Sequence, residues 1–135
     1  MEEIATFASC SVRGFITKGN KVLLVKEKGE ETWETPGGRM HKTDKNPVEA
    51  CEREVLEETG YKADVQKVLD VCTHMFEDGR RVFHIIYECG LKEKVKEPDP
   101  DITGIKWFSK SEIKELLKQG KADFHDKGVF DMFVK

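Results

Sequence analysis

The chain has 135 residues, which is enough for one domain to bury an ordinary hydrophobic core without disulfides or a structural metal. Charged residues make up 36% of the chain, yet the net charge is only −3, which argues against a broad basic surface for nucleic acid. No apolar run approaches the length of a transmembrane helix, and Met1–Ile4 lacks the basic and apolar segments of a signal peptide. We therefore expect a single cytoplasmic domain over residues 1–135, monomeric or homodimeric, with neither a membrane nor a nucleic-acid partner.

The cysteines are too scattered for a zinc site or a disulfide framework. No C-x-x-C pair occurs among Cys10, Cys51, Cys72 and Cys89. We expect them to be small, buried, reduced thiols, as is usual in a cytoplasmic protein.

The N-terminal part of the chain predicts a β-hairpin. From Ala8 to Ile16 the even positions are apolar or small and several odd positions are polar, which is the period of a half-buried strand. A turn at residues 18–20 leads into residues 21–26, an apolar run expected to be buried on both faces. Trp33 is expected to pack beside the next loop, with an exposed base-stacking role as the alternative.

A glycine-containing loop and a helix come next. Two glycines follow Pro36, and they allow a backbone path, and an approach to a ligand, that larger residues would block. A basic loop then covers residues 39–45. The following helix has strong local boundaries, namely Asn46 as N-cap, Pro47 at the first helical position and Gly60 as a left-handed stop.

This helix carries a cluster of acidic residues. Glu54, Glu57 and Glu58 fall at i, i+3 and i+4, within about 100° of arc. The neighbouring stripe, expected to face a core, consists of Val48, Cys51, Val55 and Thr59. One explanation is a solvated acidic face on which Arg53 bridges to Glu57. The other is a hard divalent cation, Mg²⁺ or Mn²⁺, that cancels the repulsion between the carboxylates and binds substrate phosphates.

The order of strand, glycine pair, loop and capped helix resembles a known family motif. The run from Gly38 to Tyr61 is similar to the Nudix box, G-x5-E-x7-R-E-U-x-E-E-x-G-U, where U is a bulky apolar residue. The helical part matches position by position at Arg53, Glu54, Val55, Glu57, Glu58 and Gly60, and Tyr61 fills the final U position. The preceding W-E-T-P-G-G also resembles the entry to this box.

The resemblance implies an enzyme that hydrolyses a diphosphate bond in a nucleoside diphosphate linked to another group, using Mg²⁺ or Mn²⁺. It assigns Glu57 and Glu58 as metal ligands and Glu54 as a ligand or general base. Arg53 is expected to hold the loop rather than contact substrate. Two backbone positions are expected to shape the loop beside metal and substrate, namely Gly37 and Gly38.

The loop departs from the family pattern by one residue. Counting from Gly38, the first acidic position falls on Asp44, and eight rather than seven residues then precede Arg53. Either Asp44 replaces the first glutamate of the box or that acid is missing. In similar proteins this acid fixes the loop to the helix arginine, so the departure bears on loop geometry more than on metal binding.

The second half of the chain predicts further strands and one more helix. Strands are predicted over residues 65–76, 81–89 and 105–108. A capping box of Ser109 with Glu112 begins a helix that ends at Gly120. The tail, residues 123–133, mixes aromatic and charged residues, and the pattern leaves open whether it packs on the domain edge or binds a partner.

Four residues outside the helix are further candidates for the site. Lys26, at the end of the second strand, and Arg39, in the basic loop, are candidate substrate contacts. His84 could line a substrate cleft, although a histidine among strand residues is more often structural. The resemblance places an acidic residue six positions before the late tryptophan near the metal. That residue is Asp101, for which a solvated acidic turn is the alternative.

Several strands interrupted by two helices, without βαβ alternation, predict an α+β fold with a mixed sheet. The resemblance implies the same architecture, an α/β/α sandwich with the sheet between helices. We expect a nucleoside triphosphate pyrophosphohydrolase, because no second domain is present to hold another large group. ADP-ribose, nucleotide sugars and dinucleoside polyphosphates are alternative substrates. A Nudix-like module that binds nucleotides without turnover is the alternative from another class. A purely structural domain would leave the acidic cluster unexplained.

Overall fold

The computed structural model describes residues 4–135, so Met1–Glu3, part of the stretch searched for a signal peptide, lies outside it. The strands are β1 (Ala8–Lys18), β2 (Lys21–Glu27), β3 (Gly37–Arg39), β4 (Tyr61–Met75), β5 (Arg81–Lys94) and β6 (Ile102–Ser109). The helices are α1 (Pro47–Thr59), α2 (Lys110–Lys118) and α3 (Lys127–Val134), with a 3-10 turn η1 (Phe124–Asp126) before α3.

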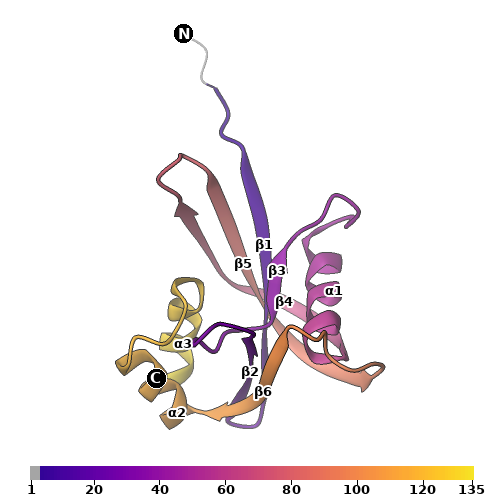
Figure 1. Ribbon diagram of the computed structural model, residues 1–135, viewed down its shortest axis with the longest axis vertical. Helices are drawn as coiled ribbons and strands as arrows, with labels where there is room; N and C mark the ends of the chain where they lie inside the picture. Colours follow the sequence, from indigo (N-terminus) through magenta and orange to yellow (C-terminus); the bar gives the residue numbers. More distant parts are fainter. Residues whose placement is uncertain (1–3) are drawn as a thin grey trace.

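The strands form one mixed sheet in the order β4-β5-β1-β2-β6, with β3 paired to β1. The β1–β5 pair is parallel, and the other pairs are antiparallel. Helix α1 lies on one side of the sheet, while α2 and α3 lie on the other (Figure 1). The expected α+β sandwich with a mixed sheet is therefore confirmed.

Each side of the sheet has its own hydrophobic core. Val12 and Ile16 of β1 pack into the core under α1, whereas Phe15 packs into the core under α2 and α3. The prediction of a half-buried first strand was therefore wrong, since Ser11 and Arg13 on its polar side are also buried. The C-terminal segment causes the difference, because it covers the second side of β1 and brings Phe133 against Phe15.

Helix α1 begins and ends where its local signals predict. The Asn46 side chain accepts a hydrogen bond from the Glu49 N–H at 2.9 Å, and Gly60 adopts a left-handed φ of 81°. The predicted core stripe needs one correction. Val48 is 38% exposed, and Ala50 is fully buried in its place, so the buried face is turned slightly from the expected one.

The glycine pair, expected as part of a loop, belongs to the short strand β3. Gly37 and Gly38 pair with Arg13 and Val12 of β1 in antiparallel register. A Cβ atom on Gly37 would lie 2.1 Å from the Val12 carbonyl oxygen, so only glycine fits at this spacing. This close pairing holds the loop entry against the sheet directly beneath α1.

The strands and the helix of the second half lie where the sequence predicted them, with longer strands. β4 and β5 are longer than expected because their polar ends, near Tyr61 and Lys94, still pair with each other after the apolar pattern has ended. The capping box of Ser109 with Glu112 is present at the start of α2. All four cysteines are free. Within residues 4–135, no helix is both long enough and apolar enough to cross a membrane.

Candidate active site

The three glutamates of α1 lie along the edge of the helix that faces β3. Glu54 and Glu58 are buried, whereas the Glu57 side chain is 36% exposed. Glu58 reaches the loop entry, since its carboxylate accepts a hydrogen bond from the Gly37 N–H at 3.0 Å. The Glu54 carboxylate lies so close to Gly38 that a Cβ atom there would meet it at 2.8 Å. The glycine pair therefore lets the strand approach both buried carboxylates.

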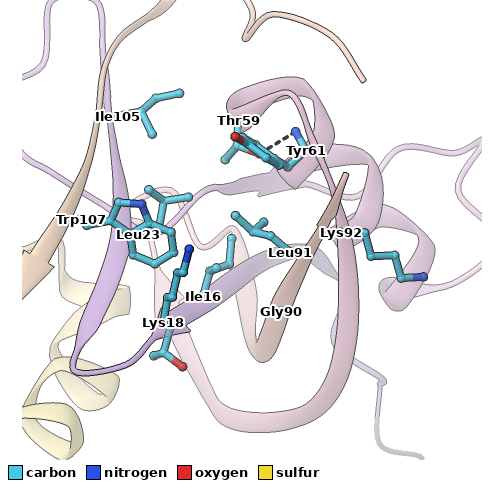
Figure 2. Close-up of a pocket in the computed structure, with 11 residues that line it drawn as sticks. Ile16, Lys18, Leu23, Thr59, Tyr61, Gly90, Leu91, Lys92, Ile105 and Trp107 are labelled. Carbon is cyan, nitrogen blue, oxygen red and sulfur yellow. Dashed lines mark hydrogen bonds between the residues drawn. The ribbon is translucent and has the colours of Figure 1, made fainter. Parts of the chain in front are cut away.

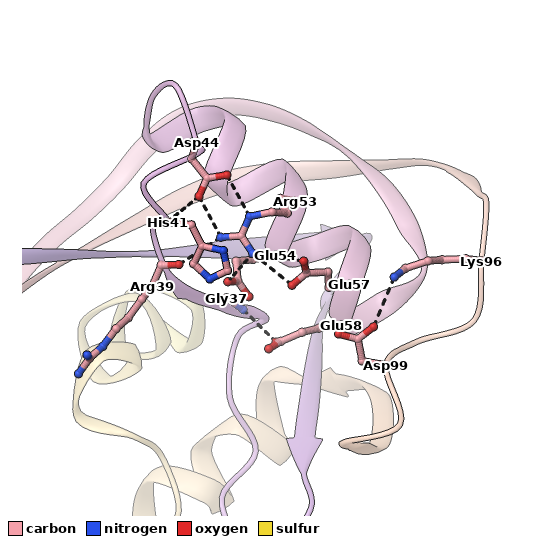
Figure 3. A network of polar contacts seen from close by, with 10 residues as sticks. All are labelled: Gly37, Arg39, His41, Asp44, Arg53, Glu54, Glu57, Glu58, Lys96 and Asp99. Carbon is pink, nitrogen blue, oxygen red and sulfur yellow. Dashed lines mark hydrogen bonds and ion pairs between the residues drawn. The ribbon is translucent and has the colours of Figure 1, made fainter.

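Arg53 ties this helix edge to the preceding loop (Figure 3). Its guanidinium donates to both carboxylate oxygens of Asp44, each at 3.0 Å, in a bidentate pair. It also contacts Glu54 at 3.0 Å and Glu57 at 3.2 Å. The expected contact between Arg53 and Asp44 is thus present in spite of the extra loop residue. The pKa of Asp44 falls to about 2, chiefly because of the hydrogen bonds from Arg53.

We predict that Asp44→Asn loosens the loop and lowers kcat by about tenfold, because the glutamates of α1 lose their fixed position relative to β3. The Asp44 pKa is depressed in the folded state, so its contribution to stability is present above its ordinary pKa and is lost as pH falls toward 2. The difference in unfolding free energy between wild type and Asp44→Asn should therefore shrink between about pH 4 and pH 2. Urea unfolding at several pH values measures it.

Asp44→Glu is the matched control, since it keeps the charge and restores the acid type of the family motif. We expect it to retain most of the activity. Wild-type kcat in Asp44→Asn would contradict a positioning role for this pair.

The donor chemistry of the helix edge fits a hard divalent cation, which prefers carboxylate oxygens. Burial raises the pKa of Glu54, and it raises that of Glu58 to about 8. A cation would favour the ionised form of both groups. The carboxylates of Glu54, Glu57 and Glu58 do not all offer oxygens within 4.8 Å of one another, and Arg53 supplies the positive charge beside Glu54 and Glu57.

Two other predicted site residues, Lys26 and Asp101, lie outside α1. Lys26 is partly buried on β2, and the carbonyl oxygen of the same residue accepts a hydrogen bond from Thr103. Asp101 is exposed, and its backbone oxygen accepts a hydrogen bond from the Lys28 N–H at 2.7 Å. Its loop is tied to the helix, because the Asp99 N–H donates to the Glu57 carbonyl at 2.8 Å. The structure does not bring Asp101 into a cluster with the glutamates, and its metal role stays a prediction.

A small cavity lies on the other side of β3, and His84 and Arg39 are part of its wall. The cavity has a volume of about 260 Å³ and is also lined by Gly38, Glu34 and residues 123–125. Its aromatic wall is made of rings in contact: His84 stacks on His125 at 5.2 Å, and Phe124 meets His84 edge-on at 5.1 Å. Gly38 therefore faces the helix carboxylates on one side and this cavity on the other.

Sequence reasoning missed several residues of this cavity. Glu34 was noted only as part of the entry to the box, and the segment of residues 123–125 lay in a tail whose role stayed open. Within residues 4–135, Glu34, Asp123 and His125 form the one group of at least three acidic, histidine or cysteine side chains that each offer a donor atom within 4.8 Å of the others. The feature of the sequence that could have indicated these cavity residues was the mixture of aromatic and charged residues in the tail. Its position opposite Glu34 follows only from the fold.

A buried charge network supports the floor of the cavity. Arg13 lies 3.7 Å from Glu34 and donates a hydrogen bond to the Thr35 carbonyl. Asp126, fully buried, accepts hydrogen bonds from the Thr35 N–H at 2.9 Å and from its hydroxyl at 2.6 Å. Burial raises the pKa of Glu34 to about 8, although Arg13 partly opposes the shift. Burial, together with His125, lowers the pKa of His84 to about 4.

We predict that Glu34→Gln flattens the pH dependence of stability between pH 5 and pH 8. The Glu34 pKa is about 8 when folded, against an ordinary 4.5, so the native state holds a proton over this range that the unfolded chain releases. The stabilisation that this bound proton gives the native state is therefore full at low pH and is lost as pH rises toward 8. One such group gives a slope of up to about 1.4 kcal/mol per pH unit, which the glutamine removes. Urea unfolding of both proteins across the range measures it, and parallel curves would contradict the assignment.

Known proteins resemble the chain over most of its length. The sequence model of the NUDIX domain matches residues 10–130. A MutT-like protein of Streptomyces ambofaciens is 26% identical over 112 residues, which cover 82% of this chain and 70% of that protein. A protein of Bacillus subtilis (strain 168), provisionally named an 8-oxo-dGTP diphosphatase, is 30% identical over 95 residues, which cover 70% of this chain and 61% of that protein. The structure of a NUDIX hydrolase from Nitrosomonas europaea superposes with a TM-score of 0.78 at 22% identity, over 94% of this chain and 88% of that one.

Proposed function

The chain belongs to the NUDIX domain family, and we propose that it hydrolyses nucleoside triphosphates to the monophosphate and pyrophosphate, with Mg²⁺ or Mn²⁺. The observation that carries the proposal is the position of Gly38 between two features. On one side lies a helix edge with three glutamates, and on the other lies an aromatic cavity. A nucleotide laid across β3 would place its phosphates on the first and its base in the second.

A Nudix pyrophosphohydrolase must activate water against a polyanion that repels nucleophiles. The divalent ion supplies charge neutralisation on the phosphate oxygens and makes water more acidic. Glu57 and Glu58 would hold that ion, and Glu54 would hold it or take the proton from the attacking water. Arg53 and Asp44 keep these carboxylates at a fixed distance from the loop, and the rigid helix sets their spacing.

The cavity beside β3 supports a nucleoside substrate. Stacked and edge-on rings provide a surface on which a base can stack, which is worth about 1–3 kcal/mol per base in other proteins. Glu34 and Asp123 add oxygen acceptors for the N–H groups of a base. At about 260 Å³ the cavity is smaller than a typical ligand pocket of about 300–1,000 Å³, so it suits one base better than a second nucleoside. Arg39, which also lines this cavity, would contact a phosphate of the bound nucleotide.

A nucleotide panel tests the proposal. Purified protein is incubated with the common nucleoside triphosphates, 8-oxo-dGTP, ADP-ribose, a nucleotide sugar and a dinucleoside polyphosphate, with and without Mg²⁺, and the products are separated by chromatography. We expect Mg²⁺-dependent release of pyrophosphate from a triphosphate. Cleavage confined to ADP-ribose or a nucleotide sugar would reject the proposed substrate class. Tight nucleotide binding without turnover would identify a binding module instead.

A further inference from the structure

Two cavities of the molecule differ in the chemistry of their walls. The larger one has a volume of about 640 Å³ and lies between strands near the end of α1, with apolar residues such as Ile16, Leu23 and Trp107 in its wall (Figure 2). Among the described residues, none that lines it is acidic or a histidine. The cavity beside β3 is different, because two acidic residues and three histidines line it. Carboxylates and imidazoles are the side chains that bind divalent metal ions.

Three of these side chains bring their donor atoms close together. Glu34, Asp123 and His125 each offer one donor atom within 4.8 Å of the others. The Glu34 carboxylate lies 3.7 Å from Nε2 of His125, and the Asp123 carboxylate lies 3.7 Å from Nδ1 of the same ring. In a tetrahedral zinc site with metal–ligand distances of about 2.0–2.2 Å, the ligand atoms are about 3.3–3.6 Å apart. Small side-chain movements would therefore be enough to place the three donors around one ion.

Two buried imidazole nitrogens in the cavity wall make no hydrogen bond. His125 is 4% exposed and its Nε2 has no partner, and His84 is 9% exposed and its Nδ1 has none either. The two rings are stacked, with their centroids 5.2 Å apart. Burying a polar nitrogen without a partner costs free energy, which a ligand bound in the cavity can offset. Because His84 is not one of the three clustered residues, it indicates independently that this cavity takes a ligand.

The charges in contact with the cluster favour a dication. One further carboxylate, that of Asp126, lies 3.4 Å from His125, and one guanidinium, that of Arg13, lies 3.7 Å from Glu34. In their ionised forms, the carboxylates of Glu34, Asp123 and Asp126 exceed the single charge of Arg13 by two, which one divalent ion balances. Both oxygens of Asp126 already accept hydrogen bonds, so this residue is suited to orienting the His125 ring rather than to binding the ion.

We infer that Glu34, Asp123 and His125 bind a divalent transition-metal ion of the Zn²⁺ type, at a site separate from the glutamates of α1. Carboxylate oxygen combined with imidazole nitrogen suits Zn²⁺, whereas Mg²⁺ prefers oxygen ligands alone. Three protein ligands leave one position of the ion open to water. The ion would join the C-terminal segment to the residues that precede β3, which are distant in sequence, and so fix one wall of the cavity.

The inference goes beyond the proposed function and does not depend on it. Glu34 and Asp123 are also the acceptors proposed for the N–H groups of a base, so a bound ion and a base would compete for the same oxygens. Zn²⁺ binding is measured without nucleotide, so its outcome is distinguishable from that of the nucleotide panel.

Zn²⁺ itself is the probe, added to the full chain after treatment with a chelator. Excess Mg²⁺ is present throughout to occupy the carboxylate edge of α1. We expect calorimetry to show one Zn²⁺ per chain with a dissociation constant of about 1–100 µM, as suits one imidazole and two carboxylates. Amides shifted by Zn²⁺ in ¹H–¹⁵N spectra should cluster at residues 33–35 and 122–126. The melting temperature should rise with Zn²⁺ concentration, because the ion binds the folded chain.

Variants test the ligand set. His125→Gln removes the nitrogen donor and should weaken Zn²⁺ binding at least about tenfold. Because His125 is buried, Asp123→Ser serves as a second variant. It removes a carboxylate that is 36% exposed, and serine can still cap η1, so the fold should survive while binding weakens about tenfold. Asp131→Ser, the same change at an exposed position of α3, should leave Zn²⁺ binding unchanged.

Three results would each overturn the inference. The first is Zn²⁺ binding that does not saturate at one ion per chain. The second is a set of shifted amides along α1 or elsewhere outside the two predicted segments. The third is an affinity of folded Asp123→Ser equal to that of the wild-type chain.

Discussion

Glu57→Gln is expected to lower kcat about 1,000-fold, which corresponds to about 4 kcal/mol of barrier, because it removes an anionic oxygen donor from the proposed metal site. The fold should survive the change. The Glu57 side chain is partly exposed, and its contact within the protein is an ion pair with Arg53, which keeps its pairs with Asp44 and Glu54. Steady-state release of pyrophosphate with saturating Mg²⁺ measures the loss.

A second readout does not depend on turnover. Mg²⁺ that binds the folded protein raises its melting temperature, and this rise should be much smaller in Glu57→Gln. Glu52→Gln is the matched control, since it removes an equal charge from an exposed position of the same helix. Activity close to wild type in Glu57→Gln, with an unchanged response to Mg²⁺, would remove the assignment of the site.

The elements near the candidate site differ in how far the sequence could predict them. The boundaries of α1 depend on local interactions at Asn46 and Gly60, so the pattern of residues was sufficient. The contact between Arg53 and Asp44 was expected from the family motif and spans only nine residues, so one extra loop residue did not prevent it. In both cases the residues that interact are close together along the chain, so the local sequence was sufficient to predict them.

Features that depend on distant segments were not predictable. Arg13 stands at a position that the strand period assigns to solvent, and its burial follows from the C-terminal segment that covers it. Thr35 and Asp126 are hydrogen-bonded across 91 residues, and no local pattern indicates that contact. The cavity beside β3 is assembled from such long-range pairs, so its residues became visible only in the fold. The glycine pair was expected in a loop and not in a strand, because glycine carries no strand pattern of its own.

Gly37→Ala is expected to destabilise the protein by about 3 kcal/mol and to lower the melting temperature by about 10 °C. The new methyl group would meet two backbone atoms of β1, the Val12 oxygen at 2.1 Å and the Arg13 Cα at 2.8 Å, neither of which can rotate away. β3 must therefore separate from β1. That movement takes the Gly37 N–H away from the Glu58 carboxylate, so we also expect a loss of activity in the protein that remains folded.

Gly90→Ala is the matched control for the steric clash expected at Gly37. Gly90 also lies in a strand, but a Cβ atom there meets nothing closer than 3.6 Å, so the substitution should change stability by less than about 1 kcal/mol and can be favourable. Because both changes add one methyl group to a strand glycine, strand propensity and unfolded-state entropy cancel in the comparison, and the distance to neighbouring backbone remains as the difference. Equal melting temperatures for the two variants would mean that β3 has room to move away from β1 at little cost. The close pairing beneath α1 would then not be what fixes the distance between the glycine pair and the helix carboxylates.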